Sequence, residues 1–147
     1  ESNRIFLDLL GDHLVPMPGL FELLAALEAA KIPKAIATSS SRELLDACLG
    51  PFDLEPRFEF VLVAEDVTHG KPHPEVYRTA ARRFGLRPEE TLVLEDSENG
   101  CRAAAAAGAF TVAVPGEHSR DHDFSVASLV VGGLGDPRLY EAIGIAR

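Results

Sequence analysis

Cysteine and positive charge are both scarce in this sequence, and long apolar runs are missing. Two cysteines, Cys48 and Cys101, are too few for a disulfide framework, so we expect a reducing, cytoplasmic location. The 14 Lys and Arg against 23 Asp and Glu give a formal net charge of −9, which argues against nucleic acid or an anionic membrane as partner. No apolar run reaches the roughly 18 residues of a membrane-spanning helix. A small anionic ligand stays possible, because one local pocket can overrule the global charge.

The sequence does contain a regular alternation of short apolar runs and helical patterns. Its 147 residues, 46% hydrophobic and 25% charged, are enough for one domain with a real core. Apolar spacing and capping residues predict helices over residues 5–14, 18–31, 41–49, 74–84, 97–107 and 137–143. Short apolar runs predict strands over residues 34–38, 58–64, 91–94, 110–114 and 129–131. This alternation predicts an α/β fold with a mostly parallel sheet.

Ligands of such sheets bind beyond the carboxyl ends of the strands, so the residues that follow each strand are the candidates for function. Thr38 and Ser39 follow the strand at 34–38 and precede a helix. A hydroxyl and free N–H groups at a helix start can bind an anion, and phosphate is the usual one. The alternative is an ordinary serine-rich helix cap, which is common.

Lys71 lies between Gly70 and Pro72 and shortly before a predicted helix. Prolines at positions 72 and 74 restrict the backbone around it, and a rigidly held ammonium suits a point charge on a phosphate. The alternative is a solvated lysine in a proline-rich turn.

Glu95 and Asp96 end the apolar run at 91–94, with Ser97 and Gly100 behind them. Adjacent carboxylates repel each other, and a divalent cation would remove that cost, so Mg²⁺ is the expected metal. The alternative is a capping Asp beside a solvated Glu. The three signals together, in this order along the chain, predict a phosphate site that also binds Mg²⁺.

Four runs carry a resemblance to a known family: Pro16 to Gly19, and the residues at 37–42, 70–77 and 94–100. In their order and spacing the chain resembles the haloacid dehalogenase (HAD) superfamily. Within it, the chain is most similar to the β-phosphoglucomutase-like sugar-phosphate phosphatases. The resemblance implies a Rossmann-like core and Mg²⁺-dependent hydrolysis of a small phosphorylated metabolite through an aspartyl-phosphate.

The resemblance also implies roles for individual residues. It assigns the phosphoryl group to the Thr38 hydroxyl and the Ser39 N–H, and makes Lys71 the lysine that neutralises nucleophile and phosphate. Asp96 becomes an Mg²⁺ ligand, with Glu95 as a direct or water-mediated partner. The Lys71–Pro72 peptide bond becomes a candidate for the cis form.

One family motif has no match. The superfamily opens with a strand that ends in D-x-D-G-T, whose first Asp is the nucleophile. The nearest run, residues 6–12, has Asp8 at the nucleophile place and Gly11 at the right offset, but Leu10 stands in place of the second Asp. The competing interpretation, favoured by helical periodicity, is that residues 1–15 are a remnant of the last cap helix and residues 16–147 are the core.

On that interpretation the sheet lacks its first, central strand and most of the cap is absent. An empty central position would leave two rows of backbone groups unsatisfied, so we expect something to fill it, preferably a strand from a second chain. Without the nucleophile, this chain is expected to be inactive. The alternatives are a non-catalytic phosphate- and Mg²⁺-binding remnant or a phosphosugar mutase.

The remaining polar residues have plainer interpretations. Cys48 and Cys101 are predicted to be packed thiols within helices. His69 and His73 flank Lys71 and could touch substrate, although solvation of their loop is the favoured interpretation. His122 lies in the polar region 115–127, for which a solvated structural loop is favoured over a metal site.

Overall fold

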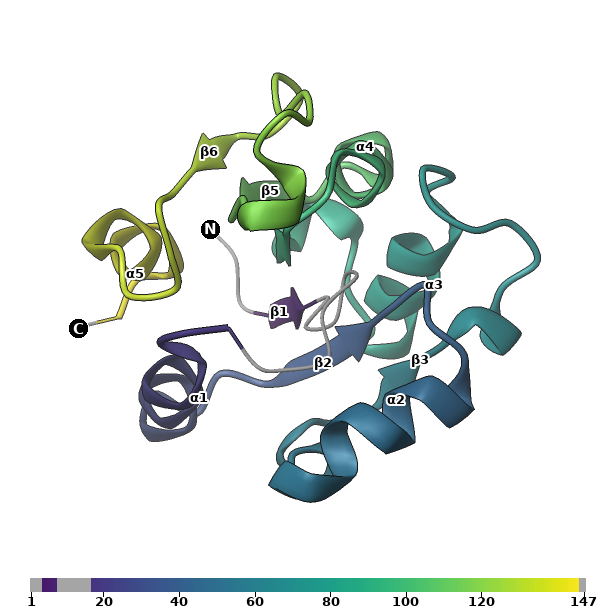
Figure 1. Ribbon diagram of the computed structural model, residues 1–147, viewed down its shortest axis with the longest axis horizontal. Coiled ribbons are helices and arrows are strands. Elements are labelled where there is room, and N and C mark those ends of the chain that lie inside the picture. Colours follow the sequence, from purple (N-terminus) through teal and green to yellow (C-terminus); the bar gives the residue numbers. More distant parts are fainter. Residues whose placement is uncertain (1–3, 8–16, 146–147) are drawn as a thin grey trace.

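Six parallel strands form one sheet through the centre of the molecule (Figure 1). The computed structural model describes residues 4–7 and 17–145. The strands are β1 Arg4–Leu7, β2 Lys34–Ala37, β3 Val61–Leu62, β4 Thr91–Glu95, β5 Phe110–Ala113 and β6 Leu129–Val130. Their order is β3-β2-β1-β4-β5-β6, and every neighbouring pair is parallel. The predicted α/β class with a parallel sheet is therefore confirmed.

Helices cover both faces of this sheet (Figure 1). They are α1 Leu20–Ala29, α2 Arg42–Leu49, α3 Glu75–Arg83, α4 Glu98–Ala107 and α5 Pro137–Ile143. The hydroxyl of Ser41 accepts a hydrogen bond from the N–H of Leu44, and that of Ser97 accepts one from Gly100. These contacts satisfy backbone donors at the starts of α2 and α4, as the serines in the sequence predicted.

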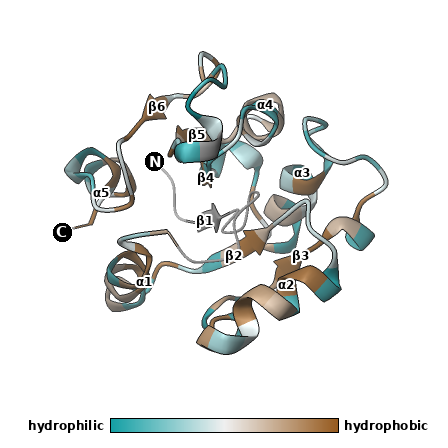
Figure 2. Ribbon diagram, in the orientation of Figure 1, coloured by the Kyte–Doolittle hydropathy of each residue, from teal (hydrophilic) through white to brown (hydrophobic). Residues whose placement is uncertain are grey.

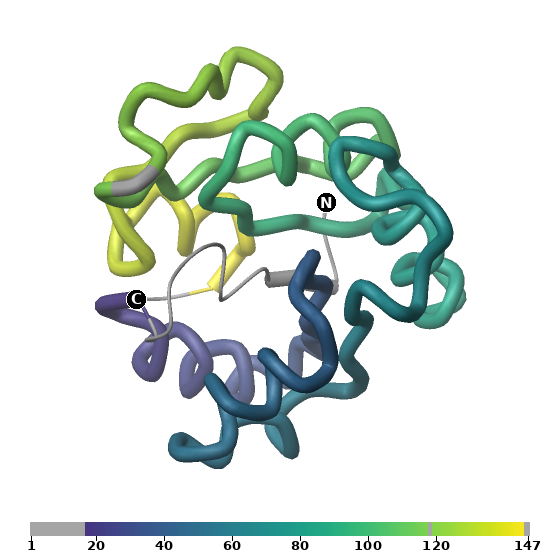
Figure 3. Tube along the Cα trace, turned by 45° about the vertical axis from the view of Figure 1, so that its right-hand side comes forward, coloured from purple at the N-terminus to yellow at the C-terminus, as the bar shows by residue number. Residues whose placement is uncertain are grey.

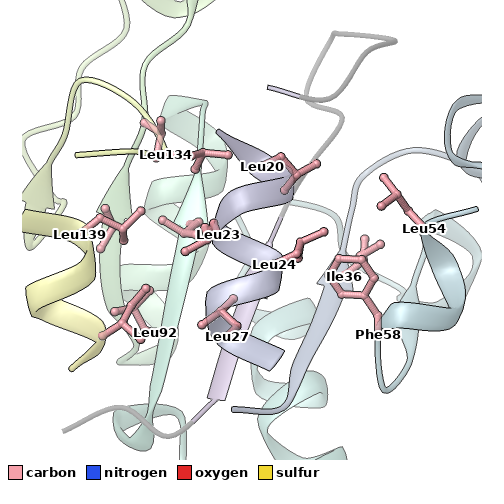
Figure 4. Close-up of a cluster of buried hydrophobic side chains, with 14 of the residues drawn as sticks. Leu20, Leu23, Leu24, Leu27, Ile36, Leu54, Phe58, Leu92, Leu134 and Leu139 are labelled. Atoms are coloured by element: carbon pink, nitrogen blue, oxygen red, sulfur yellow. The ribbon is translucent and has the colours of Figure 1, made fainter. Parts of the chain in front are cut away.

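Successive residues along β2 and β4 pack into different cores. Ile36, Leu92 and Leu94 join the cluster built on α1, α2 and α5, where the α1 leucines pack between Ile36 on one side and Leu139 on the other (Figure 4). Ala35, Ala37 and Val93 join the second cluster, with α3 and α4. Because strand side chains alternate between faces, Glu95 shares the α3–α4 side with Val93. The hydropathy colouring shows the apolar strands inside and the polar residues mainly on the outer helix surfaces (Figure 2).

The structure corrects the prediction for the start of the chain. Residues 5–14 were expected to form a helix, but Arg4–Leu7 is strand β1. Runs of three or four apolar residues do not distinguish a strand from a buried helix, and here sheet pairing decides between them. Residues 8–14, including Asp8, lie outside the described residues, so the assignment of residues 1–15 to a cap remnant stays a prediction only outside Arg4–Leu7.

The central position of the sheet, for which the cap interpretation left no strand in this chain, is occupied by β1. Leu7 pairs with Ile36 of β2 and with Leu94 of β4, so β1 lies between these two strands. Two rows of backbone groups that would otherwise be unpaired are satisfied within one chain. The strand that we expected from a second chain is thus supplied by this chain's own residues.

A group of charges links α1 to the amino ends of the strands. Glu28 accepts two hydrogen bonds from the guanidinium of Arg57, both 2.8 Å, and pairs with Lys34 at 3.0 Å. The Arg57 hydrogen bonds, followed by Lys34, lower the pKa of Glu28 to about 2. The Glu28 side chain is 39% exposed, so water screens much of this interaction.

This lowered pKa predicts a defined loss of stability in acid. The stabilisation is complete above the ordinary pKa of 4.5 and is lost as the pH falls toward about 2, where the folded carboxylate takes up its proton. Glu28→Gln should therefore flatten the pH dependence of unfolding free energy in that window, measured by urea denaturation at several pH values. Glu22→Gln, at an exposed position of the same helix, is the control. An unchanged slope in Glu28→Gln would contradict the prediction.

Within the described part of the chain, every helix is too short or too polar to cross a membrane.

Candidate phosphate-binding site

A cavity of about 220 Å³ opens at the carboxyl ends of β2 and β3. Its lining combines polar and apolar residues: Thr38, Ser39, Ala64, Val67, Thr68, Gly70, Lys71 and Val76. The structure thus brings together the two strand-end signals that lie 32 residues or more apart in the sequence, Thr38 with Ser39 and the Lys71 loop. Among the described residues, the lining includes neither Glu95 nor Asp96.

Thr38 is held firmly at the end of β2, whereas Ser39 is exposed. The Thr38 N–H donates to Leu62 at 3.0 Å, and its Oγ1 accepts a hydrogen bond of 3.1 Å from the Ser40 N–H. The chain then enters α2 through the Ser41 cap. The turn therefore places the buried Thr38 and the exposed Ser39 just before the start of α2, where anions are stabilised.

Lys71 reaches from its loop into the carboxyl edge of the sheet. Its Nζ donates to the Ala37 carbonyl at 3.1 Å and to Glu95 Oε2 at 2.5 Å. The side chain is only 4% exposed, and the Lys71–Pro72 bond is cis, as the resemblance suggested. Lys71 thereby connects the cavity with the acidic end of β4.

The loop that carries Lys71 is tied to the start of α3 by Glu75. The carboxylate of Glu75 accepts hydrogen bonds from the N–H groups of Thr68 and His69, at 2.9 and 2.8 Å. These bonds lower the pKa of Glu75. The His73 ring accepts from the Glu75 N–H and lies 4.7 Å from the His69 ring, and both histidines are exposed. Glu75 was not among the residues predicted for the site; the signal for it in the sequence was an acid in the first turn of a predicted helix.

Glu95 lies in the interior, with its side chain 0% exposed. Its Oε2 accepts from Lys71 and also from the hydroxyl of Tyr77 on α3. On the α4 side, a Cβ added to Gly100 would fall 1.8 Å from Glu95 Oε1, so the absence of a side chain at position 100 makes room for this carboxylate. The predicted solvated Glu is excluded, because the carboxylate is enclosed by α3, α4 and the Lys71 loop.

Asp96 follows directly and is also buried, just before the Ser97 cap of α4. Residues 4–7 and 17–145 contain no group of three or more His, Cys, Asp or Glu side chains that could hold a metal. Mg²⁺ is commonly held by one or two carboxylates with water, so the donor chemistry of Glu95 and Asp96 fits part of an Mg²⁺ site.

The thiol of Cys101 on α4, near Glu95 and Asp96, is not a nucleophile. Burial, followed by the charges of Glu95 and Asp96, raises the pKa of Cys101 to about 12. The thiol therefore stays protonated at neutral pH, and the prediction of a packed cysteine is confirmed for Cys101.

The polar connection between β5 and β6 lies beside the start of α4 (Figure 3). The His122 ring accepts from the Glu98 N–H at 3.1 Å, and the Glu98 carboxylate accepts from the Asp123 N–H at 3.0 Å. These contacts confirm the predicted structural loop and tie it to the residues that follow Asp96.

A protein-family model described as "Hydrolase: haloacid dehalogenase-like hydrolase" matches residues 3–108. The chain belongs to the haloacid dehalogenase-like hydrolases. Protein CbbY (plasmid) of Cupriavidus necator is 38% identical over 140 residues, covering 92% of this chain and 55% of the relative. A phosphorylated carbohydrates phosphatase of Thermotoga maritima is 38% identical over 109 residues, covering 74% and 48%.

Solved structures of this family share the fold. The crystal structure of CbbY from Rhodobacter sphaeroides in complex with phosphate has a TM-score of 0.77 and 32% identity, covering 82% of this chain and 55% of that one. The chain spans about half the length of the relatives that it matches. The HAD-like core is therefore established, whereas the activity and substrate of the whole protein are matters for proposal.

Proposed function

We propose that the chain carries the phosphate-binding half of a HAD-type phosphatase that hydrolyses a small, sugar-like phosphomonoester with Mg²⁺. The observation that carries the proposal is the cavity where Thr38 and Ser39 meet the Lys71 side chain. A lysine, a hydroxyl and a helix start are the groups that proteins use to bind phosphate. The names of the relatives, among them a phosphorylated carbohydrates phosphatase, support a sugar phosphate as substrate.

Each residue has a distinct role in this proposal. The Thr38 hydroxyl and the Ser39 N–H hydrogen-bond the phosphoryl oxygens, and Lys71 offsets their negative charge. Asp96 and Glu95 would hold Mg²⁺, which when bound would neutralise charge on the phosphoryl group. The protein is proposed to work in the cytoplasm on a small metabolite, without nucleic acid or membrane.

The first part of the test is binding of inorganic phosphate in the presence of Mg²⁺, measured by isothermal titration calorimetry. Thr38→Val keeps the shape of the side chain and removes the hydroxyl, so we expect affinity to fall about tenfold or more. Thr111→Val is the matched control. Thr111 is also buried, but its hydroxyl donates to the Ala109 carbonyl just before β5, and Thr111 does not line the cavity. Equal affinity in wild type and Thr38→Val would refute the assignment of Thr38.

The second part of the test is turnover of a generic phosphomonoester. Because the sequence has no D-x-D-G-T motif, we expect turnover well below about 1 s⁻¹, the low end for ordinary enzymes. Binding groups without a nucleophile leave only weak catalysis. Turnover above this value would contradict the expected inactivity, and its loss in Asp8→Asn would identify Asp8 as the nucleophile.

A further inference from the structure

The hydroxyl of Tyr77 lies at the junction between α3 and the acidic end of β4. Tyr77 is 1% exposed and is the third residue of α3. Its OH donates to the same oxygen of Glu95, Oε2, that accepts from Lys71 Nζ. One carboxylate oxygen on β4 therefore receives hydrogen bonds from two residues, one in the loop before α3 and one on α3 itself.

The ring of Tyr77 also contacts Lys71. The Lys71 ammonium lies over this ring, 5.0 Å from its centroid, an arrangement in which the ring face attracts the cation. Tyr77 thus acts on Lys71 in two ways: directly through its ring, and indirectly through the carboxylate that its hydroxyl holds.

From this geometry we infer that Tyr77 is a positioning residue for Lys71, and that its hydroxyl fixes Glu95 Oε2 so that the ammonium stays at the cavity. A carboxylate can rotate about its last side-chain bond, and two donors to one of its oxygens restrict that rotation. The restricted carboxylate, together with the Ala37 carbonyl, fixes the position of Lys71 Nζ. The consequence for phosphate affinity rests on the proposed function, whereas the effect on Lys71 itself does not.

The sharing of Oε2 also has an electrostatic consequence. A hydrogen bond from the phenol withdraws charge from the oxygen that faces Lys71. Glu95 then neutralises the Lys71 ammonium less completely. The electrostatic attraction between the ammonium and an anion in the cavity is therefore stronger. Tyr77→Phe would keep the ring over Lys71 but lose the hydroxyl, and with it this electrostatic effect on Glu95.

The test compares Tyr77→Phe with Tyr140→Phe. The sequence has only two tyrosines, and Tyr140 is the matched control because it is buried on α5 in the other core cluster. The first readout is the rate of reductive methylation of each lysine, followed by mass spectrometry. The chain has three lysines, so Lys31, which is exposed, and Lys34, which is buried and paired with Glu28, serve as internal references.

We expect Tyr77→Phe to raise the methylation rate of Lys71 several-fold relative to Lys34, and Tyr140→Phe to leave the ratio unchanged. The second readout is phosphate affinity, which should fall about five- to tenfold in Tyr77→Phe alone. A purely structural role would lower the melting temperature without changing the Lys71 ratio, and that result would overturn the inference. If the wild type binds no phosphate but the Lys71 ratio still rises, the proposed function fails and the positioning role of Tyr77 stands.

Discussion

Replacement of Lys71 by methionine is expected to abolish measurable phosphate binding and to lower the free energy of unfolding by about 3–5 kcal/mol. Methionine has nearly the length of the lysine stem but no charge. It removes the ammonium 2.5 Å from the Glu95 carboxylate, whose side chain is 0% exposed. The cost arises because a buried carboxylate loses its compensating charge. Urea denaturation and calorimetry with inorganic phosphate measure the two effects.

Two further variants separate charge from packing. The double variant Lys71→Met with Glu95→Gln removes both charges, so it should recover much of the stability but none of the phosphate binding. Lys34→Met is the matched control at the other end of β2, where the partner Glu28 is 39% exposed and water screens the carboxylate that remains. Its destabilisation should therefore be clearly smaller. Equal losses in Lys71→Met and Lys34→Met would show that burial of Glu95 is not the cause.

Much of the fold could be predicted because its signals are local. The cap residues Ser41 and Ser97 begin helices where the sequence placed them, and Gly108 ends α4 with a φ of 100°. Such caps depend on hydrogen bonds within a few residues. The start of the chain behaves differently, because Arg4–Leu7 becomes a strand through pairing with β2 and β4, which lie far away in the sequence. The three- and four-residue spacing of apolar residues over residues 5–14 could not reveal this pairing, because it depends on distant parts of the chain.

For the candidate site too, some residues could be predicted from the sequence, whereas the contacts that depend on packing could not. The rule that ligands bind at the carboxyl ends of parallel strands was enough to place Thr38 and Lys71 beside one cavity. The contacts that hold Lys71 were not predictable in this way. Tyr77 and Glu75 lie on α3, and only the packing of α3 against the sheet brings the Tyr77 hydroxyl to Glu95.

Alanine at position 100 should be as damaging as the loss of Lys71, although it adds a single methyl group. Gly100 lies within α4, where alanine would ordinarily be favoured by about 1 kcal/mol. Here the new Cβ would fall 1.8 Å from Oε1, 2.1 Å from Cδ and 2.5 Å from Oε2 of Glu95. A flexible side-chain end can usually move away, but this carboxylate is enclosed and bonded to Lys71 and Tyr77. We expect a net loss of about 3 kcal/mol or more.

A double-mutant cycle tests this explanation. With Glu95→Ala in the background, the carboxylate is gone, and Gly100→Ala should become neutral or stabilising by up to about 1 kcal/mol, as helix propensity alone predicts. Urea denaturation of the four proteins gives the coupling between positions 95 and 100. In Gly100→Ala alone, displacement of Glu95 should also raise the methylation rate of Lys71, because the ammonium loses the acceptor 2.5 Å away. If Gly100→Ala destabilises the Glu95→Ala background as much as the wild type, then the clash with Glu95 is not the cause. The loss of stability would then come from the backbone of α4.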